Sequence, residues 1–232
     1  MKQYKHIFCD WDDTFWDVKS NQRCAIEKLY ETNSMDKYFE SVDQFFNTFI
    51  EINSDLWLKY RDGIVKREEL RNRRFTDLLF SVGIVDEDLA ISMSDEYLRI
   101  TPRFNALFPY SKEILEYLVK EKGYKITLIT NGFNEVQFEK IRYAGLSEYF
   151  ERVITSEFAG VNKPAPGIFE YAMRKAGVRA NEAIMIGDDP YNDIIGAKGV
   201  GLDTIYFNFK GAENDLNPTY EINCLNEIKN IL

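Results

Sequence analysis

Histidine, cysteine and proline are scarce in this sequence. Its 232 residues include one histidine, three cysteines and six prolines. A zinc site built from cysteine and histidine is therefore not expected. The scattered Cys9, Cys24 and Cys224 predict free thiols in a reducing compartment, with no disulfide framework. A Ser-His-Asp triad would need His6, but no nucleophile-elbow sequence exists to serve it. We interpret His6 as a satisfied residue ahead of the first strand.

Long apolar runs and excess positive charge are also absent. The longest apolar run before Asp10 is residues 7–9, which is too short for a signal peptide. No apolar run approaches the roughly 18 residues of a membrane helix. The chain has 29 lysines and arginines against 38 aspartates and glutamates, a formal net charge of −9. This balance argues against a nucleic-acid polymer or an anionic membrane as partner. The sequence therefore predicts a cytoplasmic protein, and a small anionic substrate would need local cations or a metal to attract it.

Short apolar runs are present, and they predict the strands of a buried sheet. They lack the strict alternation of half-exposed strands and lie at residues 7–9, 126–129, 153–154, 183–186 and 204–207. From residue 112 onward, helix-period segments separate the runs, and one such helix is expected to stop at Gly177. Alternation of this kind predicts an α/β fold, with a Rossmann-like parallel sheet and helices on both faces.

The stretch between the first two strands differs, because it has helical stripes and no convincing strand. We therefore predict a core domain of residues 1–17 and 103–232, with a helical domain inserted at residues 18–102. Several aromatic residues of the insert could stack a nucleobase, but packing inside a helix bundle is the preferred interpretation; they are Phe45, Phe46, Phe49, Trp57 and Tyr60. A basic run at residues 66–74 is interpreted as a solvated helix face.

Polar residues follow each predicted strand of the core. Asp10 and Asp12 follow the first, and Thr130 and Asn131 follow the second. The third leads to Lys163, and the fourth ends at Asp188 and Asp193. Ligands of open α/β sheets bind outside the carboxyl ends of the strands, so we expect these side chains to converge on one edge.

Clustered carboxylates repel one another unless a cation joins them. Oxygen ligands without histidine suit a hard ion, and Mg²⁺ with a phosphorylated substrate is the expected combination. Lys163, the Thr130 hydroxyl and the amides around Asn131 would hold the remaining phosphate oxygens. Asp10 could attack phosphorus to form an aspartyl-phosphate, while Asp12 could protonate the leaving alkoxide and then activate water.

Four ordered motifs resemble those of the haloacid dehalogenase superfamily, and the match covers most of the chain. Residues 10–14 (Asp-Trp-Asp-Asp-Thr) resemble its first motif and residues 130–132 (Thr-Asn-Gly) its second. Residues 163–164 (Lys-Pro) resemble the third and residues 187–193 the fourth. The helical insert looks like the C1-type cap of this family.

The resemblance implies a role for each matched residue. Asp10 is implied as the nucleophile and Asp12 as the general acid/base. Three ligands are implied for Mg²⁺: the side chains of Asp10 and Asp188 and the main-chain carbonyl of Asp12. Thr130 and Lys163 are implied to bind phosphate, and Asp193 to support Lys163 or a metal-bound water.

Two further aspartates lie within these motifs. The family often has glycine where this chain has Asp13, so Asp13 stays a second candidate for the site. Asp189 is preferably a helix cap.

Within the family, residues 160–169 look most like the pyrimidine 5′-nucleotidase branch. The expected reaction is Mg²⁺-dependent hydrolysis of a small phosphorylated metabolite, with a nucleoside 5′-monophosphate as the expected substrate. Three alternatives stay open: a 2-haloacid dehalogenase, a sugar phosphomutase and a non-enzymatic phospho-receiver module. The presence of Asp12 and Asp188 speaks against the first, and the large helical insert against the last.

Overall fold

The computed structural model describes residues 3–232, and it divides into two compact units. One consists of Met1–Val18 with Asn105–Leu232, and the other of Lys19–Phe104. We call the first the core unit and the second the helical unit.

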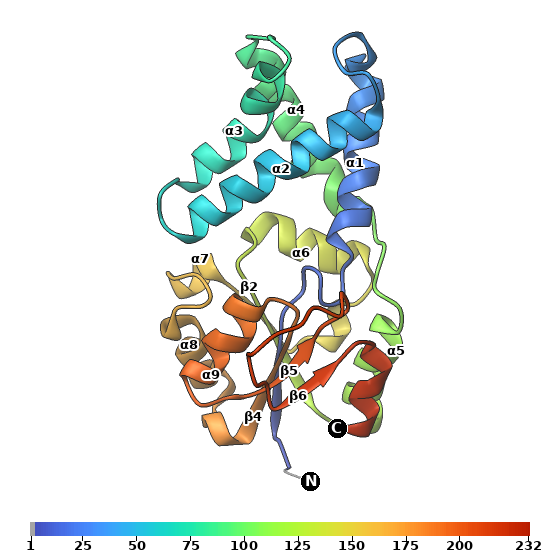
Figure 1. Cartoon of the computed structure of the whole chain (residues 1–232). Helices are drawn as coiled ribbons and strands as arrows, with labels where there is room; N and C mark the ends of the chain where they lie inside the picture. The colour runs from blue at the N-terminus through green and yellow to red at the C-terminus, as the bar shows by residue number, and fades with distance from the viewer. Residues whose placement is uncertain (1–2) are drawn as a thin grey trace. The chain divides into compact units, whose positions relative to one another are not determined.

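The core unit is built on a six-stranded parallel sheet, so the predicted α/β fold is confirmed (Figure 1). The strands are β1 (His6–Cys9), β2 (Lys125–Thr130), β3 (Arg152–Thr155), β4 (Ala183–Gly187), β5 (Asp203–Phe207) and β6 (Tyr220–Ile222), in the spatial order β3-β2-β1-β4-β5-β6. All five predicted strands are present. The sixth strand, β6, was not predicted. Its three residues, Tyr-Glu-Ile, form no apolar run that could be distinguished from chance. His6 lies inside β1 and not ahead of it.

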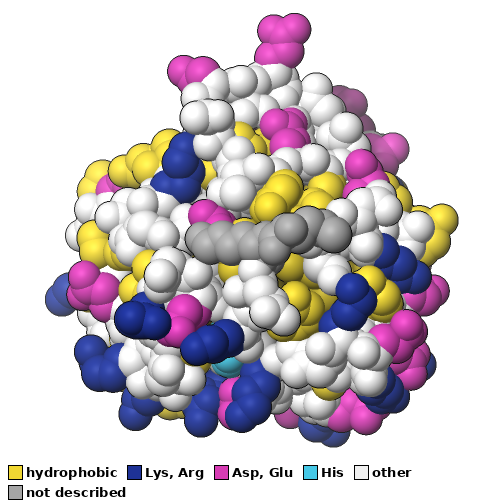
Figure 2. Space-filling view, turned by 90° about the horizontal axis from the view of Figure 1, so that it is seen from below, with side chains coloured by type: hydrophobic (Ala, Val, Ile, Leu, Met, Phe, Trp, Pro, Cys, Tyr) yellow, Lys and Arg dark blue, Asp and Glu magenta, His cyan; other side chains and the backbone are white. Residues whose placement is uncertain are grey.

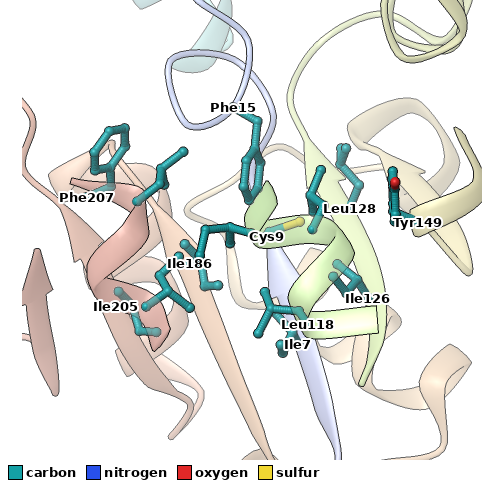
Figure 3. Packing of buried hydrophobic residues seen from close by; sticks show 14 of the residues in the cluster. Ile7, Cys9, Phe15, Leu118, Ile126, Leu128, Tyr149, Ile186, Ile205 and Phe207 are labelled. Atoms are coloured by element: carbon teal, nitrogen blue, oxygen red, sulfur yellow. The ribbon is translucent and has the colours of Figure 1, made fainter. Parts of the chain in front are cut away.

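Alternate residues of the strands point to opposite faces of the sheet and pack into two apolar layers. In β1, Ile7 and Cys9 face one cluster and Phe8 faces the other, which is the period-two pattern of a strand buried on both sides. The first layer includes Ile126, Ile186 and Ile205 from neighbouring strands (Figure 3). Helices therefore cover both faces of the sheet, as predicted.

Short helices supply the other side of each layer. Residues of α5 (Ser111–Glu116), η3 (Tyr117–Glu121) and η7 (Leu225–Asn230) join the first layer, and residues of α8 (Pro166–Ala176) and α9 (Gly196–Gly199) join the second. Gly177 ends α8 with a φ of 70°, in the left-handed region where glycine carries no steric cost, as predicted. The remaining helical segments are α6 (Asn134–Tyr143), η4 (Ser147–Tyr149), α7 (Ser156–Ala159), η5 (Ala180–Glu182) and η6 (Pro190–Ile195).

The strand order places a switch point beside β1. From β1, the sheet continues through β2 to β3 on one side and through β4 to β6 on the other. Cys9, the last residue of β1, pairs in register with Leu128 of β2 and Ile186 of β4. The loops that follow β1, β2 and β4 therefore leave the same edge of the sheet side by side, which is where ligands bind in such folds.

The helical unit contains no strand within Lys19–Phe104, all of which the structure describes. Its segments are α1 (Val18–Thr32), η1 (Met35–Lys37), α2 (Val42–Arg61), α3 (Arg67–Phe80), α4 (Glu87–Ile100) and η2 (Thr101–Arg103). Phe49 lies 5.4 Å from Phe75 and 5.1 Å from Tyr97 between ring centroids, inside one buried cluster. Phe45 and Phe46 belong to the same cluster, so packing explains these aromatic residues.

Arg74 corrects the interpretation of the basic run as a solvated face. Arg74 is only 4% exposed, and its guanidinium carbon lies 5.3 Å from the centre of the Tyr97 ring. Its Nε donates to the Leu70 carbonyl oxygen at 3.3 Å. Burial lowers the pKa of Arg74 from its ordinary value. Arg74 is therefore part of the packed interior, whereas the side chains of Arg71 and Arg73 are partly exposed and form ion pairs with Asp95 and Asp77.

Charges of both signs mix on the molecular face that Figure 2 shows, with apolar side chains between them. Among residues 3–232, no helix combines the length and the apolar composition that crossing a bilayer requires.

Candidate functional site

The loop after β1 presents Asp10 at the sheet edge. The Asp10 amide donates to the Ile186 carbonyl oxygen of β4 at 2.9 Å, so Asp10 continues the sheet register by one residue. The chain then coils around the Trp11 carbonyl oxygen, which accepts the amides of Phe15 and Trp16, both at 3.0 Å. Asp10 is 7% exposed. Its carboxylate is thus held by a rigid backbone at the carboxyl end of the central strand.

Lys163 occupies the centre of the site. Its ammonium donates to Asp10 Oδ1 at 2.5 Å and to Asp193 Oδ1 at 2.6 Å. Lys163 is 2% exposed and Asp193 is fully buried. Three groups far apart in the sequence therefore meet in a nearly dry environment, where charge-assisted hydrogen bonds are strong.

The side chain of Asn131 positions Lys163 by binding the Lys163 backbone. The side-chain Nδ2 of Asn131 donates to the Lys163 carbonyl oxygen at 2.9 Å, and the side-chain Oδ1 of Asn131 accepts the Lys163 backbone amide at 2.7 Å. The neighbouring Thr130 hydroxyl oxygen accepts the Gly132 amide at 3.0 Å, which leaves the hydroxyl proton available as a donor. The structure thus places the Asn131 side chain against Lys163 and Thr130 at the end of β2.

The loop after β4 brings Asp188 and Asp193 to the same place. Asp188 Oδ1 accepts the Thr14 hydroxyl at 3.0 Å, which ties this loop to the loop after β1. Asp193 Oδ2 accepts the Asp189 amide at 3.1 Å. A Cβ added at Gly187 would lie 2.3 Å from Asp193 Oδ2, so glycine at this position makes room for the Asp193 carboxylate.

Asp189 and Asp13 serve the loops that carry them. Asp189 Oδ1 accepts the amides of Tyr191 and Asn192, both at 2.8 Å, and so caps η6 as predicted. Asp13 Oδ1 accepts the Val18 amide at 3.1 Å, and its own φ is 59°. Burial and the nearby Asp12 raise the pKa of Asp13 to about 6. The geometry gives both residues a structural task beside the site.

The site has more negative than positive charge. Carboxylate oxygens of Asp10, Asp188 and Asp193 lie within 4.8 Å of one another, with the Lys163 ammonium on two of them. Burial, together with the neighbouring carboxylates, raises the pKa of Asp10 and Asp188, and Lys163 opposes the rise at Asp10. Burial alone would lower the pKa of Lys163, but Asp10 and Asp193 raise it. These directions agree, because excess negative charge disfavours every carboxylate and favours the ammonium.

The donor set fits a hard divalent cation. When all three carboxyl groups are ionised, they exceed the one ammonium by two negative charges, which one such ion would balance. All the donors are oxygens, the ligands that Mg²⁺ prefers. The cluster contains the predicted ligands Asp10 and Asp188, while the predicted third ligand is the main-chain carbonyl of Asp12.

Asp12 lies apart from this cluster and has its own partners. Lys140 Nζ donates to Asp12 Oδ1 at 2.7 Å, and Gln137 Nε2 donates to Asp12 Oδ2 at 2.8 Å. The Lys140 ammonium pairs with Asp12, but the Asp12 carboxylate still contributes to the raised pKa of Asp10 and of Asp13.

Sequence reasoning missed Thr14, Gln137 and Lys140 as site residues. Thr14 could have been found, since it ends the first motif. Nothing in the sequence distinguishes Lys140 or Gln137 from polar residues on a solvated helix face, because their burial depends on a partner more than 120 positions away.

Comparisons with known proteins agree with this geometry. Residues 4–201 match the family model described as haloacid dehalogenase-like hydrolase. A glyceraldehyde 3-phosphate phosphatase of Pyrococcus abyssi is 37% identical over 209 residues, covering 88% of this chain and 82% of that protein. The pyrimidine 5′-nucleotidase YjjG of Escherichia coli is 27% identical over 229 residues, covering 97% of this chain and 96% of that protein.

Solved structures give the same result. The HAD-hydrolase YfnB of Bacillus subtilis, solved bound to magnesium, superposes with a TM-score of 0.88 at 28% identity, covering 100% of this chain and 99% of that chain. A 2-haloacid dehalogenase of Pseudomonas syringae superposes with a TM-score of 0.69 at 28% identity, covering 99% and 98% respectively. The family model matches most of the chain, and the parallel sheet with the motif loops at one edge agrees with it. The chain therefore belongs to the haloacid dehalogenase-like hydrolases.

Proposed function

We propose that this hydrolase is a Mg²⁺-dependent phosphomonoesterase that works through an aspartyl-phosphate on Asp10. The observation that carries the proposal is the cluster of Asp10, Asp188 and Asp193 around the buried Lys163. When ionised, its three carboxylates exceed the single ammonium by two negative charges. A site of this charge repels a phosphate dianion unless a divalent cation is present. The phosphatases among the relatives support the same reaction class.

Asp10 would act as the nucleophile. A carboxylate oxygen of Asp10 attacks phosphorus, the ester P–O bond breaks, and the phosphoryl group becomes an acyl phosphate on Asp10. The backbone bond from Asp10 to β4 fixes the position of this side chain, and positioning is a large part of phosphoryl-transfer catalysis.

Asp12 would handle both protons. As the ester bond breaks, Asp12 donates a proton to the leaving alkoxide, which departs as an alcohol. The resulting carboxylate then accepts a proton from the water that attacks the acyl phosphate, which releases inorganic phosphate and restores Asp10 as a carboxylate. The position of Asp12 two residues after Asp10 places it beside the leaving group in this proposal.

Lys163 and Thr130 would hold the phosphate oxygens. The ammonium of Lys163 already touches the nucleophile, so it would also meet the oxygens of a group transferring to Asp10. The Thr130 hydroxyl has a proton to donate. Asn131 and Asp193 would act through Lys163, by holding its backbone and its ammonium.

Asp10, Asp188 and the Asp12 carbonyl would hold the Mg²⁺ ion. When bound, the ion would neutralise charge on the phosphoryl group. A 2-haloacid dehalogenase needs neither this ion nor a second acid, so Asp12 and Asp188 favour the phosphatase reaction although a dehalogenase shares the fold.

A nucleoside 5′-monophosphate is the proposed substrate. Two observations support it: residues 160–169 resemble those of pyrimidine 5′-nucleotidases, and the chain is similar to YjjG. A triose phosphate is the second candidate, because the glyceraldehyde 3-phosphate phosphatase is 37% identical. Both are small alkyl phosphate monoesters, so the chemistry at Asp10 and Asp12 is the same.

Phosphate release from a panel of monoesters tests the proposal. We expect Mg²⁺-dependent release from a nucleoside 5′-monophosphate, a loss of at least about 100-fold with a chelator, and recovery when Mg²⁺ is restored. Equal release after exhaustive chelation would contradict the metal. Halide release from a 2-haloacid, interconversion of hexose phosphates, or phosphorylation without turnover would replace the phosphatase with the corresponding alternative.

A further inference from the structure

Asp12 is held by two side chains of one helix. Lys140 donates to Oδ1 at 2.7 Å and Gln137 donates to Oδ2 at 2.8 Å. Gln137 and Lys140 lie three residues apart on α6, so they project from the same side of the helix. The Asp12 side chain is 30% exposed, whereas that of Lys140 is 8% exposed. A partly exposed carboxylate is therefore held by two side chains that are themselves buried.

The aromatic ring of Trp16 fixes Lys140 in turn. The Lys140 ammonium lies 3.9 Å from the centre of the Trp16 ring, and Trp16 is fully buried. A cation this close to an aromatic face is attracted by the ring. Trp16 belongs to the same loop as Asp12 and bridges to it through the backbone. The loop after β1 therefore supplies both the carboxylate and the surface on which its partner rests.

Gln137 reaches Asp12 through a space that Gly132 leaves open. A Cβ at Gly132 would lie 1.9 Å from Gln137 Nε2. Any larger residue at position 132 would therefore displace the Gln137 amide. Gly132 completes the turn that carries Thr130 and Asn131, so the same turn serves the phosphate side of the site and the hold on Asp12.

The start of α6 is anchored as well. The Asn134 amide donates to Glu157 Oε2 at 2.7 Å, and the Thr155 hydroxyl donates to Asn134 Oδ1. These bonds connect the start of α6 to the last residue of β3 and to α7. The helix that carries Gln137 and Lys140 is thus fixed relative to the sheet.

Stability alone gives no reason for this arrangement. Burying an ion pair costs about as much desolvation energy as the pair returns, and apolar side chains of similar size serve as well or better. A positioned carboxylate at a reacting bond, in contrast, changes the rate strongly, since a displacement of about 1 Å costs on the order of 100-fold.

We propose that Lys140 and Gln137 are positioning residues that aim the Asp12 carboxylate for proton transfer to the leaving group. We call this pair the α6 clamp. Each carboxylate oxygen keeps a lone pair beyond the bond it accepts, so Asp12 can still exchange a proton with substrate or water. The inference rests on the proposed function, because it assigns Asp12 the proton-transfer role stated there.

The leaving group provides the test. Protonation is required when the leaving group is a poor one, such as an alkoxide, and is nearly unnecessary for p-nitrophenolate. In Lys140→Met, we expect kcat/KM for the fastest alkyl monoester of the panel to fall about 10- to 100-fold, and kcat/KM for p-nitrophenyl phosphate to fall less than about threefold. Lys140→Arg should restore part of the alkyl-ester rate.

Two further variants complete the test. Gln137→Leu should show the same selective loss with a smaller size, and it keeps the test valid if Lys140→Met does not fold, as judged by its thermal melt. Lys120→Met is the matched control, because Lys120 pairs with Glu116 at 3.0 Å on an exposed helix surface. It should leave both kcat/KM values unchanged.

The results separate this inference from the proposed function. An active wild type whose clamp variants lose both rates equally, or lose neither, overturns the α6 clamp alone. A wild type that releases phosphate from no monoester in the presence of Mg²⁺ overturns the proposed function and the clamp together.

Discussion

The Lys163 ammonium touches two carboxylates, and only one of them, Asp10, is placed at the end of the central strand. We expect Asp10→Asn to lower turnover at least about 10³-fold, because an amide cannot form the acyl phosphate. The fold should persist, since asparagine has nearly the same shape and Lys163 keeps its bond to Asp193. Without metal, the melting temperature should be unchanged or higher, because one of the excess negative charges is gone. Phosphate release and a thermal melt measure both effects.

Asp189→Asn is the matched control for this change. Asp189 lies in the same loop cluster, but its carboxylate caps η6, and asparagine is an equally good cap. Turnover in this variant should stay near that of the wild type. Substantial turnover in Asp10→Asn would remove the aspartyl-phosphate from the mechanism.

At the scale of the element, the end of β4 depends on a glycine. In Gly187→Ala, the new methyl group would meet the Asp193 carboxylate, and Asp193 would have to move away from Lys163. We expect kcat/KM to fall about 10- to 100-fold, with the secondary structure retained in circular dichroism. Gly199→Ala is the control, because a Cβ at Gly199 meets nothing within 4 Å. Equal effects of the two substitutions would show that Asp193 does not act through Lys163.

The elements of the core were predictable to the extent that local pattern determines them. Short apolar runs identify β1 to β5, and the polar residues after them identify the loops that carry Asp10, Thr130 and Asp188. The three-residue strand β6 has no such signal, because its pairing with β5 is decided by the tertiary fold.

Buried charge was the main thing that the sequence did not reveal. Arg74 and Lys140 look like surface residues, since a charged side chain in a helix is usually solvated. Arg74 is buried against Tyr97, and Lys140 is buried beside Asp12. Each partner lies on another segment of the chain and is brought near only by the tertiary fold. Each of the four motifs was recognisable because its residues lie close together in the sequence. The side chains that pack against those motifs come from distant parts of the chain and were not predictable.

At the scale of the whole molecule, His6 links folding stability to pH. His6 is 1% exposed in the middle of the sheet, and its Nε2 lies 2.9 Å from the Thr127 hydroxyl. Burial lowers the pKa of His6 to about 4 from its usual 6.5, and the neighbouring Arg152 and Lys125 act in the same direction against Glu151. The native state therefore keeps His6 neutral at pH values where the unfolded chain already binds a proton.

The sign of the effect follows from this difference in proton binding. Between pH 6.5 and pH 4 the unfolded state holds more protons, so the free energy of unfolding falls as the pH falls. We expect His6 to contribute about 2 kcal/mol to this fall between pH 7 and pH 4.5. His6→Gln keeps a polar partner for Thr127 but does not titrate, and every other acid-sensitive group is the same in both proteins. Denaturant unfolding at a series of pH values should therefore give two curves of unfolding free energy that are parallel above pH 7. Below pH 6.5 the wild-type curve should fall more steeply than that of His6→Gln. Curves that stay parallel down to pH 4 would mean that His6 is protonated in the native state as readily as in the unfolded one.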